Sequence, residues 1–210
     1  MGNSQGVNKN EEFSIKNFQP VKTIADPFFG EGRIVEDKKT KDKYLLVQKM
    51  EREIKKNHIL QSIIHDSIAI VHPHILQIAG LSSAEKSEFC SKYYCNYIFL
   101  DCPPYTLQYE IEQRKIKSLH FSENELFGLL ESVSSALAML QRNGIKHQSL
   151  STQTIYIDER SNYKIAIPES MYVTNLFEEV CYAPKNSDYY YLCPEYVKVI
   201  QKVNKLVFEE

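Results

Sequence analysis

A long amphipathic helix is predicted in the middle of the chain, and any fold must cover its apolar side. Ser122 and Glu125 have the spacing of a capping box, in which each side chain binds the backbone N–H of the other residue. Asn143-Gly144 is a typical helix end. The apolar residues between them recur at helical spacing: Leu126, Leu129, Leu130, Val133, Leu137 and Leu140. Such a helix requires a second layer to pack against.

The residues before this helix predict an antiparallel sheet with one helix packed on it. Three strands are expected within residues 18–47. Apolar residues at three- and four-residue steps predict a helix over 54–71, before Pro73. Two further strands are expected at 75–78 and 94–100, separated by a polar loop. Together these elements predict a five-stranded sheet with one main helix.

Two prolines, Pro103 and Pro104, follow the last of these strands and predict a hinge between two lobes. After the long helix, residues 154–157 and 163–167 flank a polar turn and predict a hairpin. One more helix is expected over 196–208. Residues 1–17 are polar and predict a disordered tail.

Composition and charge exclude several classes of protein. The chain has 210 residues, 25 basic and 27 acidic, and a pI near 6.3, so it has no general attraction for nucleic acid or anionic lipid. No apolar run is long enough for a membrane span. The five cysteines form no C-x-x-C pair, which favours a reducing, cytoplasmic compartment and no metal site. Gly2 is a weak candidate for N-myristoylation, because Gly6 stands where serine or threonine is usual.

Several short motifs resemble those of protein kinases, in the same order. Gly144 to Leu150, which reads GIKHQSL, is similar to the catalytic loop G-I-x-H-R-D-L. Ser149 and Ile167 are 18 residues apart, the family spacing between the catalytic aspartate and the metal-binding aspartate. The other fragments are Phe29-Gly30 of the glycine-rich loop, Leu45-Leu46-Val47-Gln48 of the lysine strand, His72-Pro73-His74-Ile75 and Cys193-Pro194-Glu195.

The resemblance implies an α+β, two-lobe kinase-like fold. Its N-lobe would be residues 18–102, with five antiparallel strands and one main helix. Residues 103–210 would form an incomplete, mostly helical C-lobe, because kinase domains continue well beyond the last motif. Either the chain is a fragment of a longer product, or another chain supplies the missing part.

The catalytic positions implied by the resemblance carry residues that differ from those of active kinases. The phosphate-binding lysine is Gln48, and Lys49 is expected to point away, because successive strand residues face opposite sides. The helix glutamate falls near Ile63. The base is Ser149, and the metal ligands are Thr154 and Ile167. The sequence therefore predicts a pseudokinase that is not an enzyme.

The nucleotide pocket implied by the resemblance is expected to be vestigial. Gly30 is the one retained glycine of the phosphate loop, and Leu46 replaces a small residue that leaves room for adenine. Pro103 has no amide hydrogen for the adenine ring, and Leu100 and Asp101 complete this part of the pocket. No cofactor and no metal are expected.

The sequence thus predicts an inactive kinase-like protein that acts as an interaction or structural subunit. Its partners would be other protein chains that cover the incomplete C-lobe, in a cytoplasmic setting that includes cytoskeletal or membrane-associated assemblies. One alternative is an allosteric module that binds a nucleotide. Another is a residual protein kinase with an unconventional site.

Overall fold

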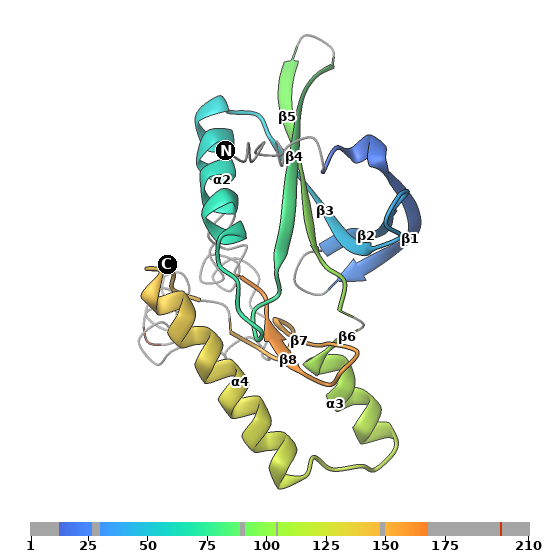
Figure 1. The fold of residues 1–210 in the computed structure, drawn as a ribbon, viewed down its shortest axis with the longest axis vertical. Helices are drawn as coiled ribbons and strands as arrows, with labels where there is room; N and C mark the ends of the chain where they lie inside the picture. Colours follow the sequence, from blue (N-terminus) through green and yellow to red (C-terminus); the bar gives the residue numbers. More distant parts are fainter. Residues whose placement is uncertain are drawn as a thin grey trace, which may run out of the picture.

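Within the described residues, the fold consists of two sheets, three α-helices and a short 3-10 helix (Figure 1). The computed structural model describes residues 13–26, 30–88, 91–103, 105–147, 150–167 and 198. The five-stranded sheet has the order β1-β2-β3-β5-β4, and all its pairings are antiparallel. Its strands are β1 (Phe18–Asp26), β2 (Gly30–Asp37), β3 (Lys43–Glu51), β4 (Ile78–Glu88) and β5 (Ser91–Asp101). A short 3-10 helix, η1 (Ile15–Asn17), precedes β1.

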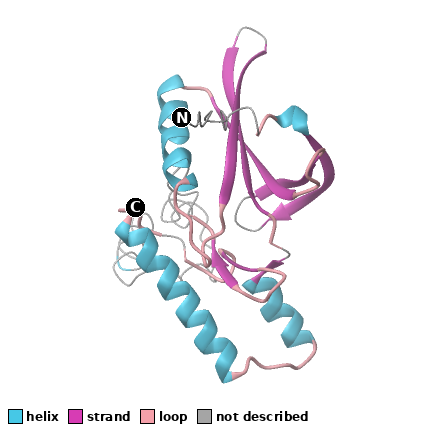
Figure 2. Ribbon diagram, in the orientation of Figure 1, coloured by secondary structure: helices cyan, strands magenta, loops and turns pink. Residues whose placement is uncertain are grey.

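Helix α2 (Ile54–Ile68) lies against one face of this sheet (Figure 1). The second sheet is small and has the order β6-β7-β8, again antiparallel. Its strands are β6 (Tyr105–Thr106), β7 (Ile155–Ile157) and β8 (Tyr163–Ile165). Helices α3 (Leu107–Ile116) and α4 (Glu123–Arg142) extend from this sheet away from the larger one (Figure 2).

The predicted α+β fold is therefore confirmed within the described residues. The capping box is present, since Ser122 Oγ accepts from Glu125 N and the Glu125 carboxylate accepts from Ser122 N. The helix ends at Arg142, and Gly144 takes a positive φ of 73°. The expected helix over 196–208 lies outside the described residues, except for Lys198.

Two predicted features differ from the structure in this region. The expected polar loop after residue 78 is instead most of β4, which pairs with β5 from Ile78 to Glu88. Because β4 is an edge strand, its polar side chains can face solvent. Sequence analysis also missed α3, whose weak apolar pattern buries only Leu107 among its residues, although Thr106 caps it by accepting from Tyr109 N.

The segment between α2 and β4 connects the two sheets. Leu76 N donates to Ile165 O at 2.8 Å, and Ile165 N donates to His74 O at 2.9 Å. These bonds form a parallel bridge between Ile75 and Ile165. One buried apolar cluster accordingly runs from α2 and the inner face of the large sheet to β7, β8 and α4.

The outer face of the large sheet carries a second, aromatic cluster. Phe18, Leu46 and Phe99 are buried there, and Phe13 packs on them. The Phe13 ring lies 5.3 Å from the Phe99 ring and directly over Gly80, where any β-carbon would collide with it. Residues 13–17, expected to belong to the tail, are therefore folded onto the sheet. The few apolar side chains of this segment are enough to hold it in place, because the sheet supplies the surface on which they pack.

We expect the variant Phe13→Ala to lower the free energy of unfolding by about 2 kcal/mol, since a half-buried aromatic side chain is lost from this cluster. Urea unfolding followed by circular dichroism measures the change. Ile15→Ala, in the same segment but exposed, serves as the control and should change stability by less than about 0.5 kcal/mol. Equal stability of Phe13→Ala and wild type would contradict the packing described here.

Candidate functional site

The candidate site lies where the two sheets meet. The larger sheet contributes the inner face of β1 to β3 and the end of β5, and the smaller sheet contributes the β7–β8 hairpin. The positions that the sequence singled out fall on both sides of this junction. The side of its strand or helix on which each side chain lies decides which of these residues belong to the site.

Strand β3 is buried on both faces from Leu45 to Val47, and the alternation of its side chains fixes which residues face α2. Leu45 and Val47 pack with Leu60 and Ile64 of α2 in the main core. Leu46 packs instead in the outer aromatic cluster. Because side chains alternate along a strand, Gln48 shares the outer face with Leu46. Gln48 is exposed, with its Nε2 atom 3.8 Å from Cys95 Sγ.

Lys49 therefore faces α2, and the expectation that it points away is wrong. Lys49 is paired directly with Asn96 of β5. The Asn96 side chain is fully buried and donates to Asn57 Oδ1 on α2 at 2.7 Å. Paired residues on neighbouring strands place their side chains on the same face. The half-buried position of Lys49 lowers the pKa of its ammonium group, because burial disfavours the charge.

Asn96 is the centre of a polar cluster beneath α2. Its Oδ1 atom accepts from Ser83 Oγ at 2.7 Å and from Gln61 Nε2 at 3.4 Å. Asn57, in the first turn of α2, is the third side chain that hydrogen-bonds to Asn96. Amide and hydroxyl groups thus surround the inner end of β3, beside Lys49. Sequence analysis missed this cluster, because isolated asparagines carry no motif.

The predicted helix-glutamate position, Ile63, is not among the residues that α2 buries. Those residues are Asn57, Leu60, Ile64 and Ser67. Ile63 is partly exposed, and its carbonyl accepts from Ser67 Oγ at 2.9 Å. Asn57 and Gln61 are polar α2 side chains that reach Asn96 on the strands. Helix α2 ends at Ile68, before an irregular connection to β4.

The expected nucleotide pocket is divided by the fold. Leu46 lies on the outer face, so it cannot restrict an adenine site on the inner face. Leu100 is buried in the main core and is paired with Leu45. Gly30 begins β2, opposite Asp26. Asp101 and Pro103 line a cavity at the junction of the sheets.

The described part of the catalytic-loop region is held to the residues that directly follow β8. His147 is buried, and its Nε2 atom is 2.8 Å from Ala166 O, so this nitrogen carries the proton that it donates. Thr154 Oγ1 accepts from Ser151 N at 2.9 Å and donates to Ser151 O. Ile167 is buried in the main core. Ser149 lies outside the described residues.

Burial of His147 lowers the pKa of its imidazole, an effect only partly opposed by the bond to Ala166. The neutral ring with a proton on Nε2 is therefore the form that fits the fold. This hydrogen bond holds His147 against Ala166, directly after β8.

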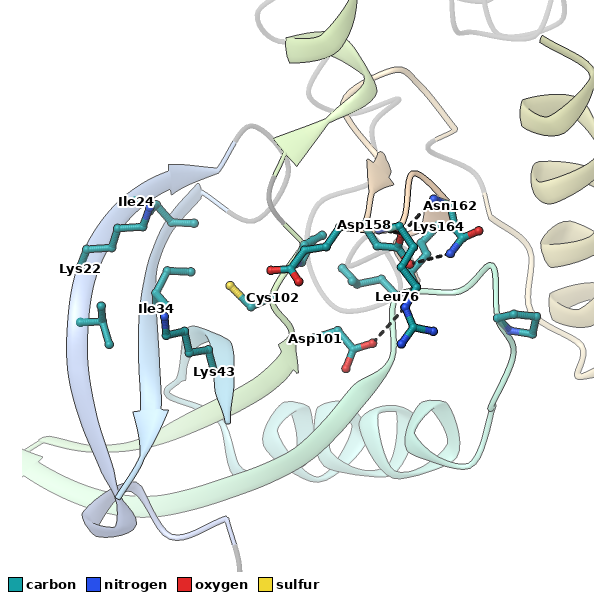
Figure 3. Close-up of a pocket in the computed structure, with 15 residues that line it drawn as sticks. Lys22, Ile24, Ile34, Lys43, Leu76, Asp101, Cys102, Asp158, Asn162 and Lys164 are labelled. Atoms are coloured by element: carbon teal, nitrogen blue, oxygen red, sulfur yellow. Dashed lines mark hydrogen bonds and ion pairs between the residues drawn. The ribbon is translucent and has the colours of Figure 1, made fainter. Parts of the chain in front are cut away.

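A cavity of about 900 Å³ opens between the inner face of β1 to β3 and the turn of the β7–β8 hairpin (Figure 3). Lys22, Ile24 and Lys43 belong to the sheet wall. Asp158 and Lys164 belong to the hairpin wall, with Cys102 and Asp101 between the two walls (Figure 3). The remaining lining residues are Val21, Ile34, Pro73, Leu76, Pro103, Glu159, Arg160 and Asn162.

Metal ligation and membrane spanning were searched over the described residues. In that part of the chain, no group of three or more histidine, cysteine or acidic side chains is arranged to hold a metal ion. No described helix is long and apolar enough to cross a membrane.

Comparison with known proteins gives distant similarity to protein kinases. The chain is 25% identical over 166 residues to a rye (Secale cereale) protein named carbon catabolite-derepressing protein kinase, which covers 73% of this chain. It is 22% identical over 169 residues to rice (Oryza sativa) proteins named serine/threonine protein kinase OSK3 and OSK4, which cover 79% of this chain. The chain spans 30% of the length of each of these relatives. No family model matches the sequence.

These similarities support a protein kinase-like relationship, and the five-stranded sheet with its helix agrees with it. They also require a correction. The prediction that the chain is not an enzyme is contradicted, because the relatives are named protein kinases. The structure adds that Gln48 lies on the outer face of β3 and Lys49 on the inner face.

We expect Asn96→Ala to lower the free energy of unfolding by about 2 to 3 kcal/mol, because it leaves Asn57 and Ser83 without their buried partner. Chemical unfolding measures the change. Asn124→Ala, at an exposed position of α4, is the matched control and should be nearly neutral. A neutral Asn96→Ala variant would show that the cluster does not hold α2 to the sheet.

We expect His147 to make the protein less stable as the pH falls through about 6.5. The native-state pKa is below the ordinary value of 6.5, so the unfolded chain binds the proton more readily in this range. Stability should therefore rise from about pH 5.5 to 7.5, and less steeply in His147→Gln. Thermal melts across this range test it, with the exposed His58→Gln as the control. Parallel pH profiles of wild type and His147→Gln would disprove the assignment.

Proposed function

We propose that this chain is a protein kinase-like subunit that binds another protein chain through an exposed apolar side of α4. The supporting observation is the exposure of Leu126, Phe127 and Leu130, which are 52%, 61% and 63% accessible. Leu130 lies four positions after Leu126 and three after Phe127, so its side chain is next to both on the helix surface. Exposed apolar surface of this kind is typical of interfaces.

The fold already buries other residues of α4. Ser132, Ala136 and Leu140, further along the helix, are buried, and Ala136 and Leu140 belong to the main core. Two further exposed apolar residues, Ile116 and Leu119, lie at the end of α3 and in the connection to α4. The α3–α4 connection is held in place by Arg114, which binds both Glu110 and Glu125. A rigid pair of helices with apolar residues at its far end is suited to docking a partner.

The ion pairs of Arg114 and its contact with Phe121 hold the α3–α4 connection in place, together with the exposed apolar residues that it carries. Arg114 Nε is 2.6 Å from Glu110 Oε1, and its guanidinium stacks over the Phe121 ring at 4.0 Å from the ring centroid. The same guanidinium holds the pKa of Glu125 at about 2, well below its usual range. Glu125 therefore keeps its negative charge, and the ion pair with Arg114 persists, over the whole physiological pH range. A partner would meet a preformed surface, which lowers the entropy lost on binding.

The test is the size of the complex that contains the tagged, full-length chain in native cell extracts. We expect wild type to sediment well above its own 24.4 kDa. Leu126→Gln combined with Leu130→Gln should shift the chain to the size of a monomer. Ile59→Gln, at an equally exposed apolar position of α2, is the matched control and should keep the larger size.

Two results would reject the proposal. One is monomer-sized wild-type chain. The other is a large complex that the double α4 variant leaves unchanged, since the partner would then bind elsewhere. A circular dichroism melt of each purified variant establishes that the helix is still folded. The substituted side chains are exposed, so the melts should differ little from wild type.

Phosphoryl transfer is a second candidate function, favoured by the names of the relatives. The lysine to test is Lys49, which faces α2 on the inner side of the large sheet. The assay is phosphate transfer from Mg-ATP by the purified chain. Activity that falls at least tenfold in Lys49→Met, but not in Lys39→Met on the exposed β2–β3 turn, would support this function. Equal activity in wild type and both variants would attribute it to a contaminant.

A further inference from the structure

A smaller cavity, of about 340 Å³, lies between α3, α4 and the small sheet (Figure 1). It is distinct from the cavity of Figure 3, with which it shares one lining residue, Asn162. Its volume is within the range of sites for small organic ligands. Each neighbouring element contributes to its wall: Glu110 and Arg114 from α3, Gly128 and Ser132 from α4, and Ile157 and Tyr163 from the small sheet.

Two buried residues of this wall carry hydroxyl groups without a partner. Ser132 and Tyr163 are only 7% and 8% exposed. Neither hydroxyl forms a hydrogen bond with a described residue, and the contact of Tyr163 with His74 Nδ1 uses the backbone carbonyl of Tyr163. Polar groups on buried residues are normally hydrogen-bonded. A ligand in the cavity would supply the missing partner of both hydroxyls.

Gly128 keeps the α4 wall of the cavity open. A β-carbon at this position would meet no other atom within 4 Å, so no close packing requires glycine here. Its φ is not positive either, so the backbone conformation would accept any residue. Glycine in the middle of a helix is destabilising relative to alanine. What this glycine provides is space, since a larger side chain would extend into the cavity.

The charged residues of the wall leave one negative charge uncompensated. Both oxygens of Glu125 are hydrogen-bonded, to Arg114 and to Ser122. Arg114 Nε donates to Glu110 Oε1 at 2.6 Å. Glu110 Oε2 forms no hydrogen bond with a described residue. Two carboxylates against one guanidinium make the cavity anionic, with an oxygen of Glu110 available to a ligand.

The field of these carboxylates reaches the Tyr163 hydroxyl. Burial raises the pKa of this phenol, and the charges of Glu125 and Glu110 act in the same direction, against that of Arg114. An anionic environment of this kind favours a cationic ligand. The apolar part of the wall includes the buried side chain of Ile157.

We propose that this cavity binds a small organic cation, whose ammonium or guanidinium group is held by Glu110, Ser132 and Tyr163. The cationic group donates to Glu110 Oε2 and to the two hydroxyl oxygens, and the apolar body of the ligand lies against Ile157 and the backbone at Gly128. The occupant is a free small molecule, although a lysine side chain of a bound protein carries the same cationic group. The proposal does not depend on the α4 interface, whose exposed apolar residues do not line the cavity.

The experiment is an NMR titration of the full chain labelled with ¹⁵N-glycine, at pH 7 and constant ionic strength. The Gly128 amide signal is identified by its absence from the spectrum of Gly128→Leu. The probe is benzylammonium, compared with the neutral benzyl alcohol and the anionic benzoate. We expect a saturable shift of the Gly128 signal with benzylammonium, and a Kd at least tenfold lower than that of benzyl alcohol. Benzoate should give no saturable shift.

Two variants assign the binding to particular side chains. Ser132→Ala should raise the Kd of benzylammonium at least threefold without lowering the melting temperature, because its hydroxyl has no partner among the described residues. Glu110→Gln should raise the Kd at least fivefold. The matched controls are Ser134→Ala and Glu112→Gln, at exposed positions of the same two helices outside the cavity. Both controls should bind benzylammonium as wild type does.

A ligand-observed measurement completes the test. The saturation-transfer signal of benzylammonium should disappear in Gly128→Leu, because the larger side chain fills the cavity. Nα-acetyl-lysine methylamide, which presents the ammonium group as a protein side chain does, should bind at least fivefold more weakly than benzylammonium. Tighter binding of the lysine derivative would overturn the assignment to a free molecule. Equal affinity for benzyl alcohol, no saturable shift of Gly128, or unchanged affinity in both Ser132→Ala and Glu110→Gln would overturn the cation site itself.

Discussion

The parallel bridge between Ile75 and Ile165 determines how the small sheet lies relative to the large one. Two backbone bonds, from Leu76 N to Ile165 O and from Ile165 N to His74 O, join the end of the α2 connection to β8. His74 Nδ1 adds a third contact, 3.0 Å from Tyr163 O. Within the described residues, the small sheet is otherwise connected to the large one by the covalent chain at residues 101–105 and by side-chain contacts.

Because backbone hydrogen bonds form the bridge, it fixes the orientation of the two sheets as well as the distance between them. It brings the β7–β8 turn opposite the inner face of β1 to β3, which creates the cavity between them. It also lets one apolar core continue from Leu60 of α2 to Leu140 of α4. The candidate binding surfaces therefore depend on contacts between residues about 90 positions apart in the chain. A substitution that weakens the bridge should affect both sheets together.

The interior beneath α2 combines apolar packing with a polar cluster. Asn57, Ser83 and Asn96 satisfy one another there, and Lys49 lies beside them with a pKa lowered by burial. Buried polar groups are tolerated when they are hydrogen-bonded, and they then favour one arrangement of helix and strands over others. This region is of interest because the chain is similar to proteins named as kinases. A lysine on the inner face of the sheet is suited to binding anionic groups.

The sequence by itself determined the local elements, because their signals are local. The capping box at Ser122 fixes the start of α4, and the apolar periodicity of α2 is plain. The tertiary structure alone decided the facing of β3. Leu45, Leu46 and Val47 form a continuous apolar run, since the main core covers one face and the aromatic cluster with Phe13 covers the other. A strand buried on both faces has no alternation in its sequence, so nothing local distinguishes Gln48 from Lys49. The convergence of Lys22, Lys43 and Arg160 likewise arises only when distant strands meet, since no short motif joins them.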